Sequence, residues 1–139
     1  MAGYASPDEL KEVLDKTFAI MNEDEEMGPK LKAADTPQRF EFSDVGLSVS
    51  VRPSREGEEG NLLWVWGDAD FEPRVRMTMD SQTANRYFQG KENVPIALAR
   101  RRIKAGGDVK AALALMPITK PVFERYRAMV EADYPHLVE

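Results

Sequence analysis

The chain of 139 residues contains no cysteine, and its only histidine is His136. Without cysteine there is no disulfide framework and no thiolate nucleophile, which fits a reducing compartment, and we expect a cytoplasmic protein. A lone histidine without cysteine cannot form the usual transition-metal site of imidazole and thiolate ligands. His136 lies close to the C-terminus, where we expect a frayed and solvated side chain. We therefore predict no metal and no cofactor.

Long apolar runs and a basic excess are also missing. No segment approaches the roughly 18 consecutive apolar residues that a membrane span requires. The first residues, 1–9, lack the basic end and the apolar stretch of a secretory signal. The net charge of −5 favours solubility and disfavours nucleic acid as a partner. The length argues for a single domain over residues 1–139, present as a monomer or homodimer.

Catalytic pairs are the third absence. No nucleophile and base, and no acid and base, stand at a recognisable spacing, so we expect no enzyme. The carboxylates of Asp68, Asp70 and Glu72 alternate as in a calcium loop. Pro73 occupies the position that needs glycine, however, which favours a turn between strands. The motif 106–108, Gly-Gly-Asp, favours a tight turn with an aspartate N-cap over a phosphate site, because the carboxylate would repel an anion.

The first structural signal in the chain is that of a helix. Ser6-Pro7-Asp8-Glu9 is typical of a capping box, with proline at the first helical position and glutamate three residues after the serine. One apolar stripe then predicts the helix itself, and it comprises Leu10, Val13, Leu14, Thr17, Phe18 and Met21. The acidic run 22–26 is expected to end the helix and begin a linker, because carboxylates oppose the dipole at a helix C-terminus.

From Gln38 onward the side-chain period changes to two, which predicts strands. The predicted strands lie within 38–43, 47–52, 62–66 and 75–79, with a turn at 44–46 between the first two. The segment 62–66 is apolar throughout and is assigned from its β-branched and aromatic content. The other three alternate polar and apolar residues. This pattern indicates a sheet with one wet face and one apolar face that must be covered.

The rest of the chain supplies the cover. We predict a helix that is capped by Asp80 or Ser81 and runs through Phe88, followed by a helical turn or two at 94–99. A fifth strand is predicted at 101–105, with Ile103 pointing inward. Two further helices follow: one at 109–116, which Pro117 stops, and a last one that begins with Pro121. This order indicates an α+β domain with a five-stranded, mainly antiparallel sheet. Helices cover one face, and residues 117–139 form a C-terminal helical extension.

Two groups of side chains carry functional hypotheses. Arg100-Arg101-Arg102 is the sharpest basic cluster, and it is either a solvated edge or a site for an anionic head group and a transient membrane contact. Methionine and tryptophan gather on the predicted apolar faces, and methionine re-packs readily around varied ligands. Apolar residues at regular spacing are ordinarily core, so periodicity leaves a filled core and an apolar cavity both open.

An ordered set of short motifs runs from Val75 to Met116. The pieces are Val75-Arg-Met-Thr-Met-Asp80, a helix ending Phe88-Gln-Gly90-Lys91, Pro95 to Ala99, Ile103-Lys-Ala-Gly-Gly-Asp108, and Ala111-Ala112-Leu113 with Leu115. This set resembles the sterol carrier protein type-two family, in which a strand with Met/Thr alternation leads into a short helix and Gly-Lys, and a Gly-Asp turn starts a helix of small residues. The upstream helix and strands agree in order, so the resemblance covers about Leu10 to Met116.

The resemblance implies an apolar tunnel between the sheet and the helices, and a non-catalytic protein that binds or transfers a fatty acid, fatty acyl-CoA, sterol or similar lipid. The expected lining comprises Trp64, Trp66, Met77, Met79, Phe88, Ile96, Leu113, Met116, Phe123 and Met129. Residues 117–139 lie beyond the matched pattern, and the two tryptophans reduce the space for a ligand. Two other functions stay open: a structural or dimerising module with a filled core, and an accessory subunit that presents a lipid-like intermediate to a partner enzyme.

Overall fold

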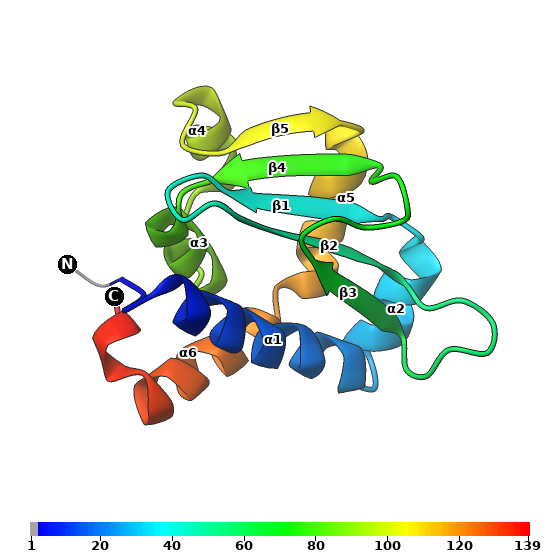
Figure 1. Ribbon diagram of the computed structural model, residues 1–139, viewed down its shortest axis with the longest axis horizontal. Helices are drawn as coiled ribbons and strands as arrows, with labels where there is room; N and C mark the ends of the chain where they lie inside the picture. The colour runs from blue at the N-terminus through cyan, green and yellow to red at the C-terminus, as the bar shows by residue number, and fades with distance from the viewer. Residues whose placement is uncertain (1–2) are drawn as a thin grey trace.

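The computed structural model describes residues 3–139, in which helices cover one face of a five-stranded sheet (Figure 1). In chain order the elements are α1 (Pro7–Glu23), α2 (Met27–Ala34), β1 (Gln38–Phe42), β2 (Leu47–Pro53), β3 (Leu62–Trp66), β4 (Val75–Met79), α3 (Ser81–Phe88), α4 (Val94–Ala99), β5 (Lys104–Gly107), α5 (Val109–Thr119), α6 (Val122–Asp133) and the 3₁₀ turn η1 (Pro135–Leu137). The predicted α+β class is confirmed.

The strand order is β3-β2-β1-β4-β5, with β1 at the centre. The β1–β2, β2–β3 and β4–β5 pairs are antiparallel, whereas β1 and β4 run parallel. The sheet is therefore mixed and mostly antiparallel. A parallel neighbour requires a crossover rather than a hairpin. Residues 67–74 provide it, passing in front of β2 and β1 in the view of Figure 1.

The strand register gives the sheet one apolar and one polar face, as predicted. Phe40 on β1 pairs with Val49 on β2 and with Met77 on β4. Because side chains alternate along a strand, these residues point to the helices, and Arg39 and Glu41 point to the other face. On that outer face Arg39 donates hydrogen bonds to the hydroxyl groups of Ser48 and Ser50 and to the carbonyl of Gly67.

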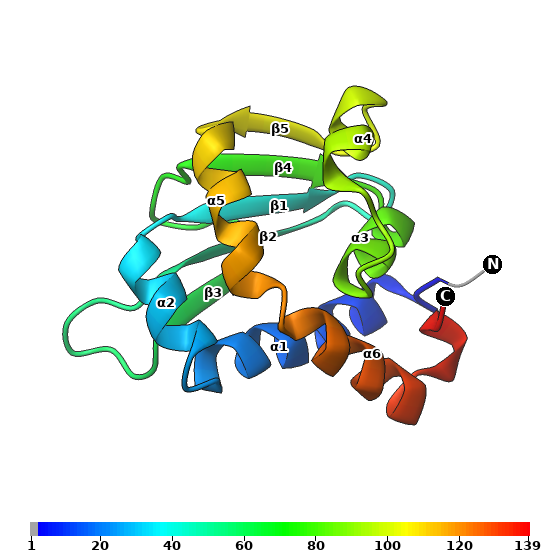
Figure 2. The ribbon, with the colours of Figure 1, turned by 180° about the vertical axis from the view of Figure 1, so that it is seen from behind.

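The helices meet the inner face in two groups (Figure 2). α5 crosses the strands diagonally, with α2 on one side of it and α3 and α4 on the other. α1 and α6 pack against each other along the β3 edge and below α3. Buried apolar residues from every layer meet here, among them Leu10, Leu14, Phe42, Val49, Val75 and Tyr126. The inner face of the sheet is therefore the hydrophobic core of the domain.

Short polar motifs fix the helix starts. The Ser6 hydroxyl accepts a hydrogen bond from the Glu9 amide, which confirms Ser6 as the predicted N-cap. The Glu9 carboxylate accepts one from the Ala5 amide instead of the Ser6 amide, so the return bond of the predicted capping box is shifted by one residue. Asp80 caps α3 and Asp108 caps α5 in the same manner as Ser6. These caps satisfy amide groups that a helix cannot satisfy internally.

The acidic run 22–26 was predicted to end the first helix and to begin a linker. The first part is confirmed, because α1 ends at Glu23, and the second is wrong, because a second helix, α2, begins at Met27 directly after the run. The carboxylate of Asp24 accepts hydrogen bonds from the amides of Glu26 and Met27. The same residue follows α1 as its C-cap. Sequence reasoning considered only the end of one helix, whereas a carboxylate placed there also stabilises the start of the next.

Two predicted boundaries in the last third of the chain are corrected. The fifth strand spans Lys104–Gly107 rather than 101–105, because Arg101 adopts a left-handed conformation (φ 61°) and the amides of Arg102 and Ile103 bond back to Ala97. Ile103 is buried nonetheless, as predicted. α5 continues through Pro117 to Thr119. Pro117 has no N–H to donate to the Leu113 carbonyl, and the helix continues past this one missing hydrogen bond.

The C-terminal residues are ordered against the start of the chain, and the prediction of a frayed His136 is wrong. Its Nε2 atom contacts the Glu9 carboxylate at 2.5 Å. Leu137 is fully buried, and its carbonyl accepts hydrogen bonds from the amide groups of Asn85 and Gln89. The end of the chain is therefore held by polar contacts that only the tertiary structure brings together.

Candidate ligand cavity

A cavity of about 60 Å³ lies between the apolar face of the sheet and the helices. It passes beneath α5, from Leu31 of α2 at one end to Val94 and Leu98 of α4 at the other. A single water needs roughly 10–15 Å³ of such space, so the cavity as it stands holds only a few small groups. Its wall is formed by Phe18, Met21, Leu31, Thr36, Gln38, Phe40, Val51, Arg52, Pro53, Leu62, Met77, Tyr87, Phe88, Val94, Leu98, Ala105, Val109, Ala112, Leu113, Leu115, Met116, Thr119 and Val122.

Four of the ten predicted lining residues are in this wall: Met77, Phe88, Leu113 and Met116. Met77 extends from β4, Phe88 from the end of α3, and the other two from α5. Leu113 lines the cavity and is also 42% exposed, so the cavity reaches the molecular surface beside it. Whether these side chains contact a ligand stays a prediction.

Trp64 and Trp66 lie on the inner face of the sheet but outside the cavity wall. Both indole N–H groups donate to the same carboxylate oxygen of Asp15 on α1, at 3.1 Å from Trp64 and 2.7 Å from Trp66. The ring of Trp64 also packs against Phe18, with centroids 5.8 Å apart. The two tryptophans therefore attach α1 to the edge strand β3, and Trp64 adjoins Phe18 and Val51, which both line the cavity.

The other four predicted residues occupy different surroundings. Met79 is buried in the core. Phe123 packs edge-on against Tyr87 with centroids 5.5 Å apart, and Met129 is half-buried on α6. Ile96 is 45% exposed on α4. None of the four is in the wall of the cavity.

Sequence reasoning missed much of the wall that the helices provide. Phe18 and Met21 come from the stripe on α1 that was assigned to core, and Leu31 comes from the helix that was not predicted. Ala105 and Ala112 are small residues that face the cavity from β5 and α5. Small side chains that lie opposite large ones leave space between the layers. Small size is therefore the one signal in the sequence by which these two positions could have been found.

Polar groups are few in the cavity wall. Burial raises the pKa of Tyr87, an effect that the polar side chain of Thr119 only partly offsets. The phenol is therefore neutral at physiological pH. The Thr119 hydroxyl also donates to the carbonyl of Leu115. This pair can orient one polar group of a ligand, but it contains no nucleophile with a base beside it.

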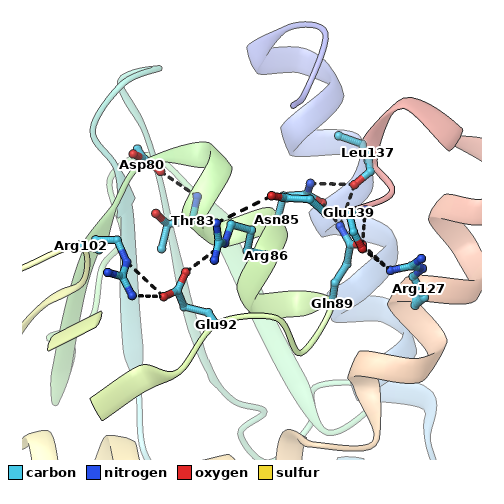
Figure 3. A network of polar contacts seen from close by, with 10 residues as sticks. All are labelled: Asp80, Thr83, Asn85, Arg86, Gln89, Glu92, Arg102, Arg127, Leu137 and Glu139. Carbon is cyan, nitrogen blue, oxygen red and sulfur yellow. Dashed lines mark hydrogen bonds and ion pairs between the residues drawn. The ribbon is translucent and has the colours of Figure 1, made fainter. Parts of the chain in front are cut away.

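A buried network of hydrogen bonds joins α3 to the C-terminal end of the chain (Figure 3). Asn85 and Gln89 of α3 share a hydrogen bond, and both donate to the carbonyl of Leu137. Tyr126 of α6 donates to the Asn85 carbonyl oxygen at 2.8 Å, which leaves the Tyr4 hydroxyl as the donor in the 2.6 Å contact between the two tyrosines. Burial is the main cause that raises the pKa of Tyr126 and of Tyr4, so both stay neutral.

The buried carboxylate of Glu92 lies on the other side of α3 (Figure 3). Its side chain is 1% exposed and lies between Arg86 of α3, at 3.3 Å, and Arg102, at 2.5 Å. Glu92 precedes α4 and Arg102 follows it, so this ion pair joins the two ends of the segment that contains α4. A buried carboxylate between two guanidinium groups has a structural explanation and needs no metal.

Over residues 3–139, no group of three or more histidine, aspartate or glutamate side chains is arranged to hold a metal ion. Over the same range no helix has the length and apolar character to cross a membrane. A second, open groove of about 580 Å³ lies between the α1–α2 connection and the α5–α6 junction. Four acidic residues, 23–26, line it, so it does not resemble a site for an apolar ligand.

Comparison with models of protein families and with curated proteins finds no match. Comparison with solved structures does. Sterol Carrier Protein 2 from Yarrowia lipolytica, in its apo form, superposes with a TM-score of 0.60 at 15% identity, over 88% of this chain and 94% of that one. A structure named UbiJ-SCP2, a ubiquinone synthesis protein, gives 0.58 at 10% identity, over 85% and 93% of the two chains.

The same fold occurs as a part of larger proteins. The sec-alkylsulfatase Pisa1 from Pseudomonas sp. matches with a TM-score of 0.56 at 19% identity, over 66% of this chain, and this chain spans 14% of that chain. These likenesses extend over most of the chain and show that it has the sterol carrier protein 2 fold. The sequence resemblance to the sterol carrier protein type-two family is thereby confirmed at the level of the fold.

Proposed function

We propose that this protein binds a hydrophobic ligand, of the fatty acid, fatty acyl-CoA or sterol type, in the cavity beneath α5, and that it carries or transfers this ligand without catalysis. The observation that supports the proposal is an apolar void between the sheet and the helices that reaches the surface at Leu113. The fold is shared with proteins whose names include sterol carrier. The reducing compartment that a chain without cysteine favours is the cytoplasm.

The ligand enters, on this proposal, by displacing α5. The void of about 60 Å³ is too small for a complete acyl chain, so binding requires the layers to separate. α5 carries Ala112, Leu113 and Met116 over the cavity, and Leu115 is its one buried side chain. Each methylene group that leaves water contributes about 0.8 kcal/mol, which rewards such a movement without polar contacts.

Titration with a fatty acid while following tryptophan emission tests the proposal, because Trp64 packs against Phe18 and pairs with Val51, and both of these residues line the cavity. Ala112→Phe places a phenyl group in the cavity and should weaken binding at least tenfold. Ala114→Phe is the matched control, because Ala114 is an exposed residue on the same helix. Emission that stays constant across fatty acids, acyl-CoA and sterols, or equal binding by both variants, would count against the proposal.

The small volume of the cavity supports a second candidate, a structural or dimerising module with a filled core. In that case no lipid binds and the measured mass depends on concentration. The half-buried Trp64 and Trp66, tied to Asp15, are not available as a dimer contact. Sedimentation across a range of concentrations, with and without a fatty acid, separates the two candidates.

A third candidate is an accessory subunit that presents a lipid-like intermediate to a partner enzyme. It is supported by the occurrence of this fold within an alkylsulfatase and in a protein named for ubiquinone synthesis. A stable complex recovered by affinity purification, together with slow transfer of lipid between vesicles, would favour the accessory subunit over a free carrier.

A further inference from the structure

An ion pair joins the two ends of the segment that contains α4, residues 92–102. Glu92 at its start and Arg102 at its end form an ion pair of 2.5 Å, and Arg86 of α3 contacts the same carboxylate at 3.3 Å. The amide of Arg102 also donates to the carbonyl of Ala97. α4 therefore projects from the edge of the domain beside β5 as a short, fixed element (Figure 1, Figure 2).

α4 presents different residues inward and outward. Val94 and Leu98 line the cavity, and Ala97 is fully buried. Pro95, Ile96 and Ala99 are exposed, and so are Arg100 and Arg101, which follow directly. We name these five residues the α4 surface. It combines an apolar tip with two adjacent cations.

The α4 surface lies on the helix that contributes Val94 and Leu98 to the cavity wall. Ile96 and Leu113 are the two large apolar side chains in residues 3–139 that are strongly exposed, at 45% and 42%. Leu113 is itself a lining residue, and α4 contributes two others. Both strongly exposed apolar side chains therefore come from helices that line the cavity, α4 and α5.

The charge at this place is opposite to that of the whole chain. The net charge is −5, yet the carboxylate next to α4, Glu92, is buried between two guanidinium groups. Arg100 and Arg101 take part in none of the ion pairs formed within residues 3–139. An apolar residue flanked by free cations is the arrangement that binds the interface of an anionic bilayer.

We propose that the α4 surface docks on the anionic surface of a lipid bilayer, with Ile96 inserted among the head groups and Arg100 and Arg101 paired with lipid phosphates. Docking there places α4, which contributes Val94 and Leu98 to the cavity wall, against the membrane, so a ligand passes between bilayer and cavity beside this helix. This inference rests on the proposed lipid-binding function, because it assigns the partner from which the ligand comes.

Co-sedimentation with vesicles tests the proposal. The wild-type protein should bind vesicles of equimolar phosphatidylcholine and phosphatidylglycerol, bind phosphatidylcholine vesicles weakly, and be released from both at molar salt. Arg100→Gln with Arg101→Gln should weaken binding about 25-fold, because each cation near an anionic surface contributes about fivefold. Ile96→Ser should weaken it at least fivefold. The matched control is Lys11→Gln with Lys32→Gln, which removes two exposed cations from α1 and α2.

Wild-type protein that binds neither type of vesicle, or a control pair that loses as much binding as the α4 pair, would overturn the docking site. The first result would also favour a protein as the partner of this surface. Ligand titration by tryptophan emission, measured on each variant, separates this failure from failure of the proposed function. Normal titration without vesicle binding overturns the docking site alone, whereas absent titration in the wild type overturns the cavity proposal.

Discussion

Tyr126 on α6 donates a hydrogen bond of 2.8 Å to Asn85 on α3, and both side chains are fully buried. This contact connects the helix that follows α5 to the helix that forms one wall of the cavity. The Tyr126 hydroxyl group also accepts a hydrogen bond from the hydroxyl group of Tyr4, near the start of the chain. The Tyr126 hydroxyl group thus connects three segments that lie far apart in the sequence: the start of the chain, α3 and α6.

Tyr126→Phe should therefore lower the free energy of unfolding by about 1–2 kcal/mol, because it leaves buried partners with one hydrogen bond fewer. Urea denaturation monitored by circular dichroism measures the change. Tyr134→Phe is the matched control. The Tyr134 hydroxyl contacts the exposed residues Glu12 and Lys16, where water can replace it, so a change within about 0.5 kcal/mol is expected. Equal effects of the two variants would show that the network adds nothing specific.

The link between α1 and the edge strand gives a second prediction. Asp15→Ala removes the common acceptor of Trp64 and Trp66 and should cost about 2 kcal/mol, since hydrogen bonds to a charged group are stronger than neutral ones. It should also shift the tryptophan emission maximum. Asp15→Asn retains an acceptor and should cost less than half as much. An Asp15→Ala protein with unchanged emission would contradict the geometry.

Glu58 predicts a dependence of stability on acid pH. The hydrogen bonds from Arg52, and then from the Arg55 amide, lower the pKa of Glu58 from 4.5 to about 2. A carboxyl with a depressed pKa stabilises the folded state above its unfolded value, and this contribution is lost as pH falls from about 4.5 towards 2. Glu58→Gln should flatten the stability profile in that window. Glu59→Gln, on the exposed neighbouring residue, should leave it unchanged. Carboxyl titration by NMR reads the pKa directly, and a value near 4.5 would refute the contact.

The ion pairs that Glu92 forms with Arg86 and Arg102 give a fourth prediction. Glu92→Gln removes the carboxylate that Arg86 and Arg102 share and leaves Arg86 only its 3.8 Å contact with Glu139. It should cost about 2 kcal/mol, less than the about 3–5 kcal/mol for fully buried pairs because both arginines are partly exposed. Arg76→Gln is the control, since its partner Glu72 is exposed, and a change within about 0.5 kcal/mol is expected. Hydrogen exchange should accelerate in residues 93–101 of Glu92→Gln. Unchanged exchange there would show that the ion pair does not hold α4.

Most of the fold was accessible from the sequence, because period-two patterns place Phe40, Val49 and Met77 on one face whatever their partners are. The motifs 75–116 added the order of the remaining elements. α2 was missed because the carboxylate of Asp24 serves two helices, and a pattern that ends one helix does not reveal the next.

The residues that line the candidate cavity were harder to predict from the sequence than the fold was. Periodicity indicates which side chains face inward, but it does not show where inward-facing side chains fail to meet. Met77 and Phe88 border the void, whereas Met79, also on the inner face of β4, is packed in the core. The bond between Asp15 and the two tryptophans joins positions 49 and 51 residues apart, and no local pattern records such a pairing.

The most direct test of the account is mass spectrometry of the purified protein, first under native conditions and then after organic extraction. The account predicts a mass above that of the chain, an apolar molecule in the extract, and a reduced amount of that molecule with Ala112→Phe but not with Ala114→Phe. A native mass equal to the chain alone, together with no saturable uptake of added fatty acid, acyl-CoA or sterol, would contradict a ligand cavity beneath α5.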